Sequence, residues 1–130
     1  MEEDYKLVDK RKILKFLDSP LGQRMHAAAE TDNLYKEQPF VLGIRADRLS
    51  DEFPSDETVM IQGIIDVFFI EDGEIVLMDY KTDAVKEEKE LIDRYKTQLD
   101  YYEEALKRIT GMNVKERLIY SFALGETISL

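Results

Sequence analysis

A long apolar stretch in the middle of the chain constrains the fold more than any other feature. Residues 59–70 read Val-Met-Ile-Gln-Gly-Ile-Ile-Asp-Val-Phe-Phe-Ile and are apolar at nearly every position. A strand of this kind is buried on both faces, usually beneath helices. The Asp72-Gly73 pair is typical of a tight turn, so residues 75–81 are predicted to pair antiparallel with this strand. A hairpin covered on both sides therefore forms the predicted centre of the fold.

A long helix and a short strand are predicted after the hairpin. Between residues 86 and 109 the apolar side chains recur in alternating steps of three and four, the period of an amphipathic helix. Gly111 follows as a helix stop signal. Residues 117–122 favour a short strand, which a Gly125-containing tail follows.

Two short helices are predicted near the start of the chain. Asp9 is predicted to cap a helix over residues 10–17, whose apolar positions mark one face. Ser19-Pro20 predicts the start of a second helix that runs to about Glu30, because serine suits the N-cap and proline the first turn.

One more strand completes the predicted order. Residues 34–44 favour a strand, and Pro39 places it at a sheet edge or at a bulge. Residues 50–57 are acidic and are predicted to form a solvated surface loop without function. The order ααβββαβ predicts an α/β fold in which helices flank a small mixed β-sheet. Residues 1–130 are expected to form a single domain.

The composition limits the classes of function. The absence of cysteine excludes disulfides and thiolate metal sites. No apolar run approaches the roughly 20 residues that a membrane-spanning helix needs. The acidic start, residues 1–4, differs from the basic start of a signal peptide. A cytoplasmic location and no membrane partner are therefore expected.

The net charge of −10 argues against a free-standing, tight DNA-binding module, since such modules are usually basic. Two classes stay open. One is a domain that never contacts nucleic acid, which the composition alone favours. The other is a domain that receives DNA from a larger neighbour.

Three charged residues stand out in the apolar hairpin. Asp66 lies on its first strand, and Asp79 and Lys81 lie on the second, where alternation places them on one face. Charged side chains in strands built for burial are costly unless they are paired or bound to a metal. One explanation is a structural one, a buried Asp–Lys ion pair with Asp66 capping a turn.

The other explanation is a metal site. Two neighbouring carboxylates suit Mg²⁺ or Mn²⁺, and the main-chain carbonyl of Tyr80 is a candidate further ligand. A divalent ion there generates hydroxide and stabilises charge on a phosphoryl oxygen, and Lys81 can orient water or neutralise the transition state. An isolated Asp-x-Lys is usually structural, whereas Gly-Ile-Ile-Asp followed thirteen residues later by Asp-Tyr-Lys-Thr favours the metal site.

Together these motifs resemble the RecB-like branch of the PD-(D/E)XK nucleases, which have a restriction-endonuclease-like fold. The matching residues are Gly63-x-x-Asp66, Asp79-Tyr80-Lys81-Thr82 and Gln98-x-x-x-Tyr102. The resemblance implies that the two aspartates bind the metal and that the lysine is catalytic. It also implies that Gln98 and Tyr102 contact DNA, although their spacing alone indicates only a shared helix face with a core tyrosine.

Two upstream residues are further candidates. Glu37 falls in a stretch that looks like the family's Glu-x-Pro-Phe strand, whose glutamate approaches the metal. His26, the only histidine, stands four residues after Gly22 and so fits the family's Gly-x-x-x-His pattern formally. The motif histidine of the proteins resembled here is expected further upstream, so His26 is either a metal ligand or incidental.

The resemblance extends over residues 12–130. Residues 19–24 and 120–126 look like the C-terminal nuclease domain in the A subunit of the AddAB-type ATP-dependent helicase–nucleases. The chain has no Gly-x-x-x-x-Gly-Lys-Ser/Thr loop for ATP, so it is expected to be a piece of a longer protein. Basic DNA-binding surfaces are then expected from the helicase region and from an AddB-type partner subunit.

The resemblance implies a Mg²⁺- or Mn²⁺-dependent deoxyribonuclease. Its expected substrate is single-stranded DNA that the helicase delivers from a duplex end, during repair of double-strand breaks by recombination. The alternative is a catalytically silent module of the same fold that serves a partner subunit as a docking scaffold. The acidic charge disfavours a stand-alone resolvase-like or restriction-like nuclease.

Overall fold

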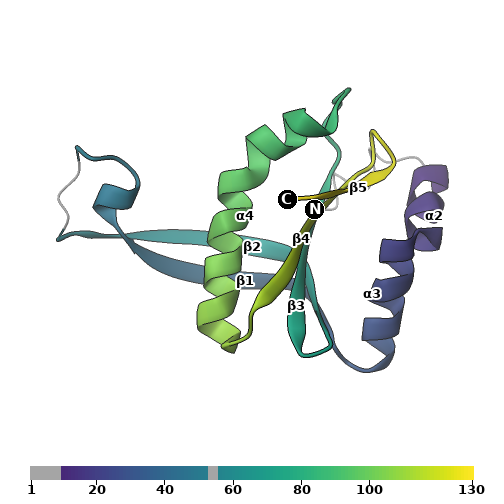
Figure 1. Cartoon of the computed structure of the whole chain (residues 1–130), viewed down its shortest axis with the longest axis horizontal. Helices are drawn as coiled ribbons and strands as arrows, with labels where there is room; N and C mark the ends of the chain where they lie inside the picture. Colours follow the sequence, from purple (N-terminus) through teal and green to yellow (C-terminus); the bar gives the residue numbers. More distant parts are fainter. Residues whose placement is uncertain (1–9, 53–55) are drawn as a thin grey trace.

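We describe the computed structural model of the chain over residues 10–52 and 56–130. A five-stranded sheet lies between α4 on one face and the α2–α3 pair on the other (Figure 1). The elements are α2 (Lys10–Asp18), α3 (Pro20–Glu30), β1 (Leu34–Arg45), the 3₁₀ turn η1 (Ala46–Arg48), β2 (Thr58–Glu71), β3 (Glu74–Lys81), α4 (Glu88–Thr110), β4 (Val114–Ser121) and β5 (Glu126–Ser129).

The strands lie in the order β1-β2-β3-β4-β5, and the sheet is mixed, as predicted. Its first three strands pair antiparallel, β3 and β4 pair parallel, and β5 returns antiparallel to β4. Helix α4 makes the crossover between the two parallel strands, which requires a connection of this length. None of the helices in the described part of the chain combines the length and apolar character needed to cross a membrane.

The predicted order ααβββαβ is confirmed except at its end, where the structure adds β5. Gly125 adopts φ 65° and turns the chain back, so that Ile128 pairs with Ile119 of β4. The sequence pattern missed β5 because only one of its four side chains, Ile128, is buried. A strand that short has no visible alternation.

The predicted ends of the N-terminal helices are partly confirmed. The Ser19 hydroxyl accepts a hydrogen bond from the Gly22 N–H at 3.1 Å, and Pro20 opens α3, as expected. Asp9, the predicted cap of α2, lies outside the described residues. In the predicted acidic loop at 50–57, residues 53–55 are outside them as well, and the described remainder lies largely exposed.

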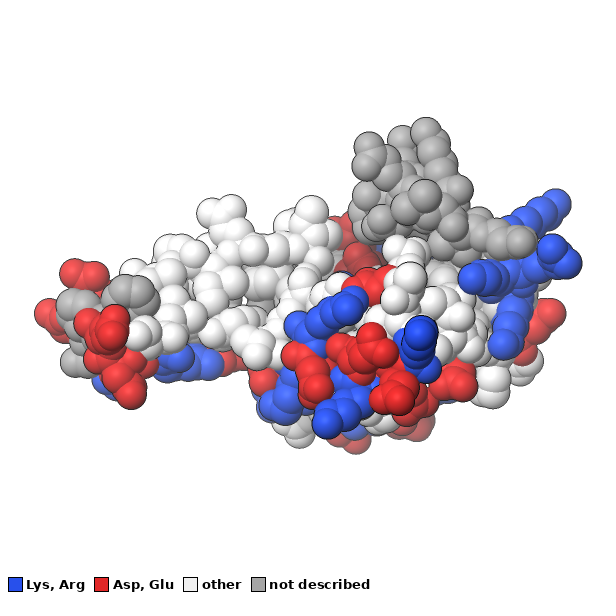
Figure 2. Space-filling view, turned by 90° about the horizontal axis from the view of Figure 1, so that it is seen from above, with Lys and Arg blue, Asp and Glu red and all other residues white. Residues whose placement is uncertain are grey.

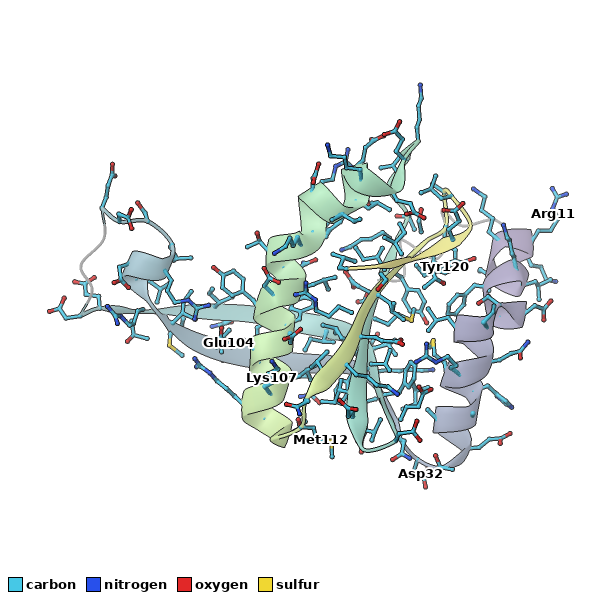
Figure 3. The ribbon with its side chains drawn as sticks, in the orientation of Figure 1. Arg11, Asp32, Glu104, Lys107, Met112 and Tyr120 are labelled. Carbon is cyan, nitrogen blue, oxygen red and sulfur yellow. The ribbon has the colours of Figure 1, made fainter. Side chains whose placement is uncertain are left out.

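Two apolar clusters hold the layers together, one on each face of the sheet. Below α4 the cluster includes Ile65, Phe68 and Leu77, all buried. Below α2 and α3 it includes Phe69 and Tyr120, and Figure 3 shows Tyr120 between the sheet and the N-terminal helices. The expectation that β2 is buried on both faces holds for its second half.

The first half of β2 corrects that expectation. Met60 and Ile64 are 58% and 56% exposed. This half of β2 runs with β1 as a long hairpin that extends past α4 at the left of Figure 1, beyond the cover of the N-terminal helices. Its α4-facing side stays covered through Phe40 and Leu42, and its other side faces solvent.

A break in the alternation of β2 lies where the hairpin leaves the body of the sheet. Ile65 and Phe68 both face α4 although they are three residues apart, whereas Val67 and Phe69 face the N-terminal helices. In a regular strand, residues on one face are an even number apart. The phase of the strand therefore shifts by one residue between Ile65 and Phe68, next to Asp66. On β1, Glu37 lies opposite this break and adopts φ 51°.

Gly22 is explained by packing at the junction of α2 and α3. A Cβ at this position would overlap the Phe16 carbonyl and lie 2.7 Å from the Leu17 carbonyl oxygen. Both atoms belong to the backbone, which cannot turn aside as a side chain can. The glycine of the Gly22-x-x-x-His26 pattern is therefore required by the helix junction, independently of any metal ligand.

We expect Gly22→Ala to lower the free energy of unfolding by on the order of 2–3 kcal/mol, because the added methyl forces the two helices apart. Chemical denaturation measures the loss. Gly43→Ala is the matched control, since the methyl there would meet only side-chain atoms, the nearest at 3.3 Å. An equal loss in both variants would contradict this account of Gly22.

Candidate active site

Asp66 and Asp79 meet where the ladder between β2 and β3 ends. The last assigned pair is Val67 with Met78, and the two aspartates occupy the next position. There the Asp66 carboxylate takes the place of a strand partner, because its Oδ2 accepts a hydrogen bond from the Tyr80 N–H at 3.2 Å. The end of the ladder thus brings the two predicted carboxylates together.

Burial and mutual repulsion govern this pair. Asp79 is only 3% exposed. Burial, the hydrogen bond to Asp79 and the charge of Asp79 together raise the pKa of Asp66 to about 7. Two carboxylates in an apolar sheet cannot both ionise without cost. Asp66 therefore keeps its proton to a higher pH than an ordinary aspartate does.

Lys81 is the one cation against the pair within the described residues, and three groups hold it. Its Nζ lies 2.8 Å from Asp79 Oδ2, donates to Gln98 Oε1 at 3.3 Å, and stands 3.9 Å from the centroid of the Tyr95 ring. The side chain is 16% exposed. The predicted shared face of Asp79 and Lys81 is confirmed by this contact.

One oxygen of the pair lacks a hydrogen bond. Asp79 Oδ2 is buried and accepts none from residues 10–52 or 56–130, although Lys81 Nζ lies within ion-pair distance. The two observations agree if the ammonium contributes charge without aiming a proton at this oxygen. A buried carboxylate oxygen that accepts no hydrogen bond still has lone pairs that a cation can use.

Helix α4 supplies the wall of the site. Gln98 holds Lys81, and Tyr102 packs edge-on against Phe40 with ring centroids 5.3 Å apart. Burial, followed by the charges of Asp79 and Asp66, raises the pKa of Tyr102 to about 12. The predicted Gln98 and Tyr102 therefore share the site with the carboxylates. Beside them, a groove of about 260 Å³ lies between α4 and the start of the β1–β2 hairpin.

Sequence reasoning missed Tyr95, which lies on this wall, and Asp83, its hydrogen-bond partner in the segment between β3 and α4. The Tyr95 hydroxyl donates to Asp83 Oδ2 at 2.7 Å while its ring covers the Lys81 ammonium. Burial and the Asp83 carboxylate raise the pKa of Tyr95 to about 12. By its spacing, Tyr95 belongs to the apolar stripe of the helix. Its place three residues before Gln98 is the signal that points to the site.

Glu37 and Tyr80 lie beside the pair. Glu37 sits opposite Asp66, between the pairs Lys36–Val67 and Gln38–Ile65, and its side chain is exposed. Tyr80 turns its N–H toward Asp66, and in an extended strand the carbonyl of the same residue points to the same side. Their roles as metal ligands stay predictions.

The structure does not bring His26 to the site. His26 lies on α3, which covers the face of the sheet opposite α4. Its side chain is 77% exposed, and Nε2 pairs with Glu30 at 3.0 Å. The formal match to Gly-x-x-x-His therefore arises from a helix that packs on the other side of the sheet.

The donor set suits a hard divalent cation. Asp66 and Asp79 offer carboxylate oxygens, and the Tyr80 carbonyl lies on the same side of β3. Mg²⁺ and Mn²⁺ take oxygen ligands, and Mg²⁺ usually keeps several waters with one or two carboxylates. Within the described residues no three histidine, aspartate or glutamate side chains cluster.

We expect Asp66→Asn to stabilise the metal-free protein at pH 8 by on the order of 2 kcal/mol, and by much less at pH 5. The pKa of Asp66 is raised from 3.8 to about 7, so the stability its protonated form contributes is present at low pH. That contribution is lost progressively as the pH rises from 3.8, where the carboxyl ionises in the unfolded chain, to about 7, where it ionises in the folded one. Asparagine keeps the neutral form at every pH.

Urea denaturation in EDTA at the two pH values measures the effect. Asp93→Asn, at an exposed position of α4, removes the same formal charge and serves as control. A stabilisation that is equal at pH 5 and pH 8 would show that the Asp66 carboxylate is not held beside Asp79.

Comparison with known proteins agrees with this geometry. Residues 5–127 match the family described as the PD-(D/E)XK nuclease superfamily. The chain is 38% identical to the A subunit of the ATP-dependent helicase/nuclease of Lachnoclostridium phytofermentans, over 99% of the chain and 12% of that protein. It is also 38% identical to the protein of the same name from Clostridium acetobutylicum, over 99% of the chain and 10% of that protein.

The protein of that name from Clostridium botulinum is 42% identical, over 98% of this chain and 10% of the relative. The chain thus spans about a tenth of the length of these relatives. The family match covers nearly the whole chain, including Asp66, Asp79 and Lys81. The chain therefore belongs to the PD-(D/E)XK nuclease superfamily.

Proposed function

We propose that the chain is a metal-dependent deoxyribonuclease domain that hydrolyses phosphodiester bonds of single-stranded DNA. The observation that carries the proposal is the pairing of half-buried Asp66 with buried Asp79, with Lys81 beside them. A purely structural ion pair needs one carboxylate for one ammonium. The second carboxylate is explained by a divalent cation.

Asp66, Asp79 and the Tyr80 carbonyl would hold Mg²⁺ or Mn²⁺, and Glu37 would join them from β1. When bound, the ion supplies a nucleophile at neutral pH and stabilises negative charge on the phosphoryl group. Glu37 is exposed opposite Asp66, so it can approach an ion from the solvent side. His26 has no part in this arrangement, because it lies on the opposite face of the sheet.

Lys81 acts as the catalytic cation. Asp79, Gln98 and the Tyr95 ring hold its ammonium in place, so it is aligned before substrate arrives. A donor aligned in this way stabilises charge that develops in the transition state without further reorganisation. Gln98 and Tyr102 would line the path of the strand, next to the groove between α4 and β2.

The relatives suggest the wider setting. Their printed name joins a helicase with a nuclease, and this chain matches about a tenth of them. We infer that a helicase region in a longer parent chain, together with an AddB-type partner subunit, delivers single strands from a duplex end. Repair of double-strand breaks by recombination, in the cytoplasm, is the corresponding role of the whole enzyme.

The first test is a calorimetric titration of Mn²⁺ and Mg²⁺ into the protein. We expect saturable binding that Asp79→Asn weakens at least tenfold, because loss of a ligand or of a group that orients one costs about 10- to 100-fold in affinity. His26→Ala is the matched control and should bind the ion as the unaltered protein does. Unchanged binding in Asp79→Asn would place the ion elsewhere and contradict the proposal.

The second test separates binding from chemistry. We expect Lys81→Gln to keep Mn²⁺ binding and to lose about 10²- to 10³-fold in cleavage of a single-stranded oligonucleotide, as for other charge-stabilising donors. Cleavage assays in Mn²⁺ buffer measure the loss. Metal binding without cleavage in the unaltered chain would favour the docking scaffold, unless a chain extended upstream restores activity.

A further inference from the structure

Helix α2 is positively charged, whereas the chain as a whole is acidic. It carries Lys10, Arg11, Lys12 and Lys15 against a single acid, Asp18. With a net charge of −10 for the whole chain, the residues outside α2 sum to −13. Figure 2 shows one group of blue side chains at the right-hand end of the molecule, over α2, and others interspersed with red side chains nearer the centre. In Figure 3 Arg11 extends away from the body of the protein.

The lysines of α2 are not neutralised. Lys10, Lys12 and Lys15 are exposed, and none of them forms an ion pair with a carboxylate in residues 10–52 or 56–130. Elsewhere, cations are mostly paired, as Arg24 is with both Glu71 and Glu116. The positive charge of these three lysines is therefore available to a ligand.

The other unpaired lysines do not form a second surface of this kind. They are Lys36 on β1 and Lys86 and Lys89 around the start of α4. The latter two stand among three glutamates, at positions 87, 88 and 90, which offset their charge. Within the described residues, α2 is thus the place where unpaired cations accumulate.

Helix α2 contacts β3, which carries Asp79, from the face of the sheet opposite α4. The Phe16 ring of α2 packs edge-on against the Tyr80 ring at 5.4 Å between centroids. Tyr80 stands between Asp79 and Lys81 in the sequence. Helix α2 and the site therefore both lie against the C-terminal end of β3, on opposite faces of the sheet.

We propose that α2 binds the phosphate backbone of the same single nucleic-acid strand whose reacting phosphate lies at Asp66 and Asp79. The identity of the strand rests on the proposed function. Since the rest of the chain repels a polyanion, a local cluster of unpaired lysines is needed to hold one near the site. Leu14 and Leu17 are 50% and 55% exposed on the same helix and offer apolar contacts to unpaired bases.

An acidic protein is the other polyanion that could occupy this surface. Single-stranded nucleic acid is favoured because the site next to the surface is built for a phosphodiester and a cation. Phosphate contacts of this kind are independent of base sequence and depend strongly on salt. That dependence gives a direct readout that needs no catalysis.

The test compares two triple variants of the whole chain that carry the same net charge. Lys10→Gln/Lys12→Gln/Lys15→Gln removes the proposed contacts, and Lys36→Gln/Lys96→Gln/Lys107→Gln removes three exposed lysines from β1 and α4. Fluorescence anisotropy with a labelled single-stranded oligonucleotide measures affinity in EDTA between about 50 and 200 mM salt. Circular dichroism melts verify that both variants fold.

We expect the slope of log affinity against log salt to fall by about 2 in the α2 variant, since each single-strand phosphate contact contributes about 0.7. At the lowest salt its affinity should fall at least tenfold, while the control keeps the slope of the unaltered protein. Equal slopes in the two variants would overturn the proposal. So would the absence of salt-dependent binding by the unaltered chain.

A parallel titration with poly-glutamate tests the other class of partner. If the α2 variant loses poly-glutamate and keeps the oligonucleotide, α2 is a protein-docking surface and the proposal is overturned. Because all these measurements are made without metal, their failure is distinguishable from failure of the proposed nuclease, which is read by Mn²⁺ binding at Asp79.

Discussion

The repulsion between a buried and a half-buried carboxylate is the constraint on which the rest of the structure depends. Asp66 and Asp79 stand at the end of the β2–β3 ladder with Lys81 as their cation. Apolar clusters on both faces of the sheet hold the strands close enough to impose this contact. A divalent ion at the proposed site would relieve this repulsion, so the same burial that disfavours two charges in the free protein would favour the ion.

Much of the architecture could be predicted because it depends on local patterns. The continuous apolar run of β2, the turn at Asp72-Gly73 and the period of α4 each act over a few residues, and each is confirmed. Asp79 and Lys81 could be placed on one face because strand alternation is regular there. Strand β5 could not, since it depends on pairing with β4 and buries one side chain.

The rest of the site depends on contacts that no local pattern encodes. The shift of phase in β2 beside Asp66 lies opposite Glu37 of β1, which adopts a positive φ, and neither feature has a pattern in the sequence. The sequence marks Tyr95 only as a core residue of α4, and its contact with the Lys81 ammonium is visible only in the folded chain. His26 is the opposite case. Its spacing from Gly22 fits the family pattern, yet the residue lies on α3, on the face of the sheet opposite the site.

The projecting β1–β2 hairpin places the two carboxylates in different parts of the sheet. Asp79 lies in β3, which is paired with β2 and β4 in the middle of the sheet. Asp66 lies at the base of the projecting hairpin, at the point where β2 leaves the helices and its outer face meets solvent (Figure 1). The place of Asp66 therefore depends on the pairing of β2 with β1 in the hairpin, whereas the place of Asp79 depends on the pairing of β3 within the body of the sheet.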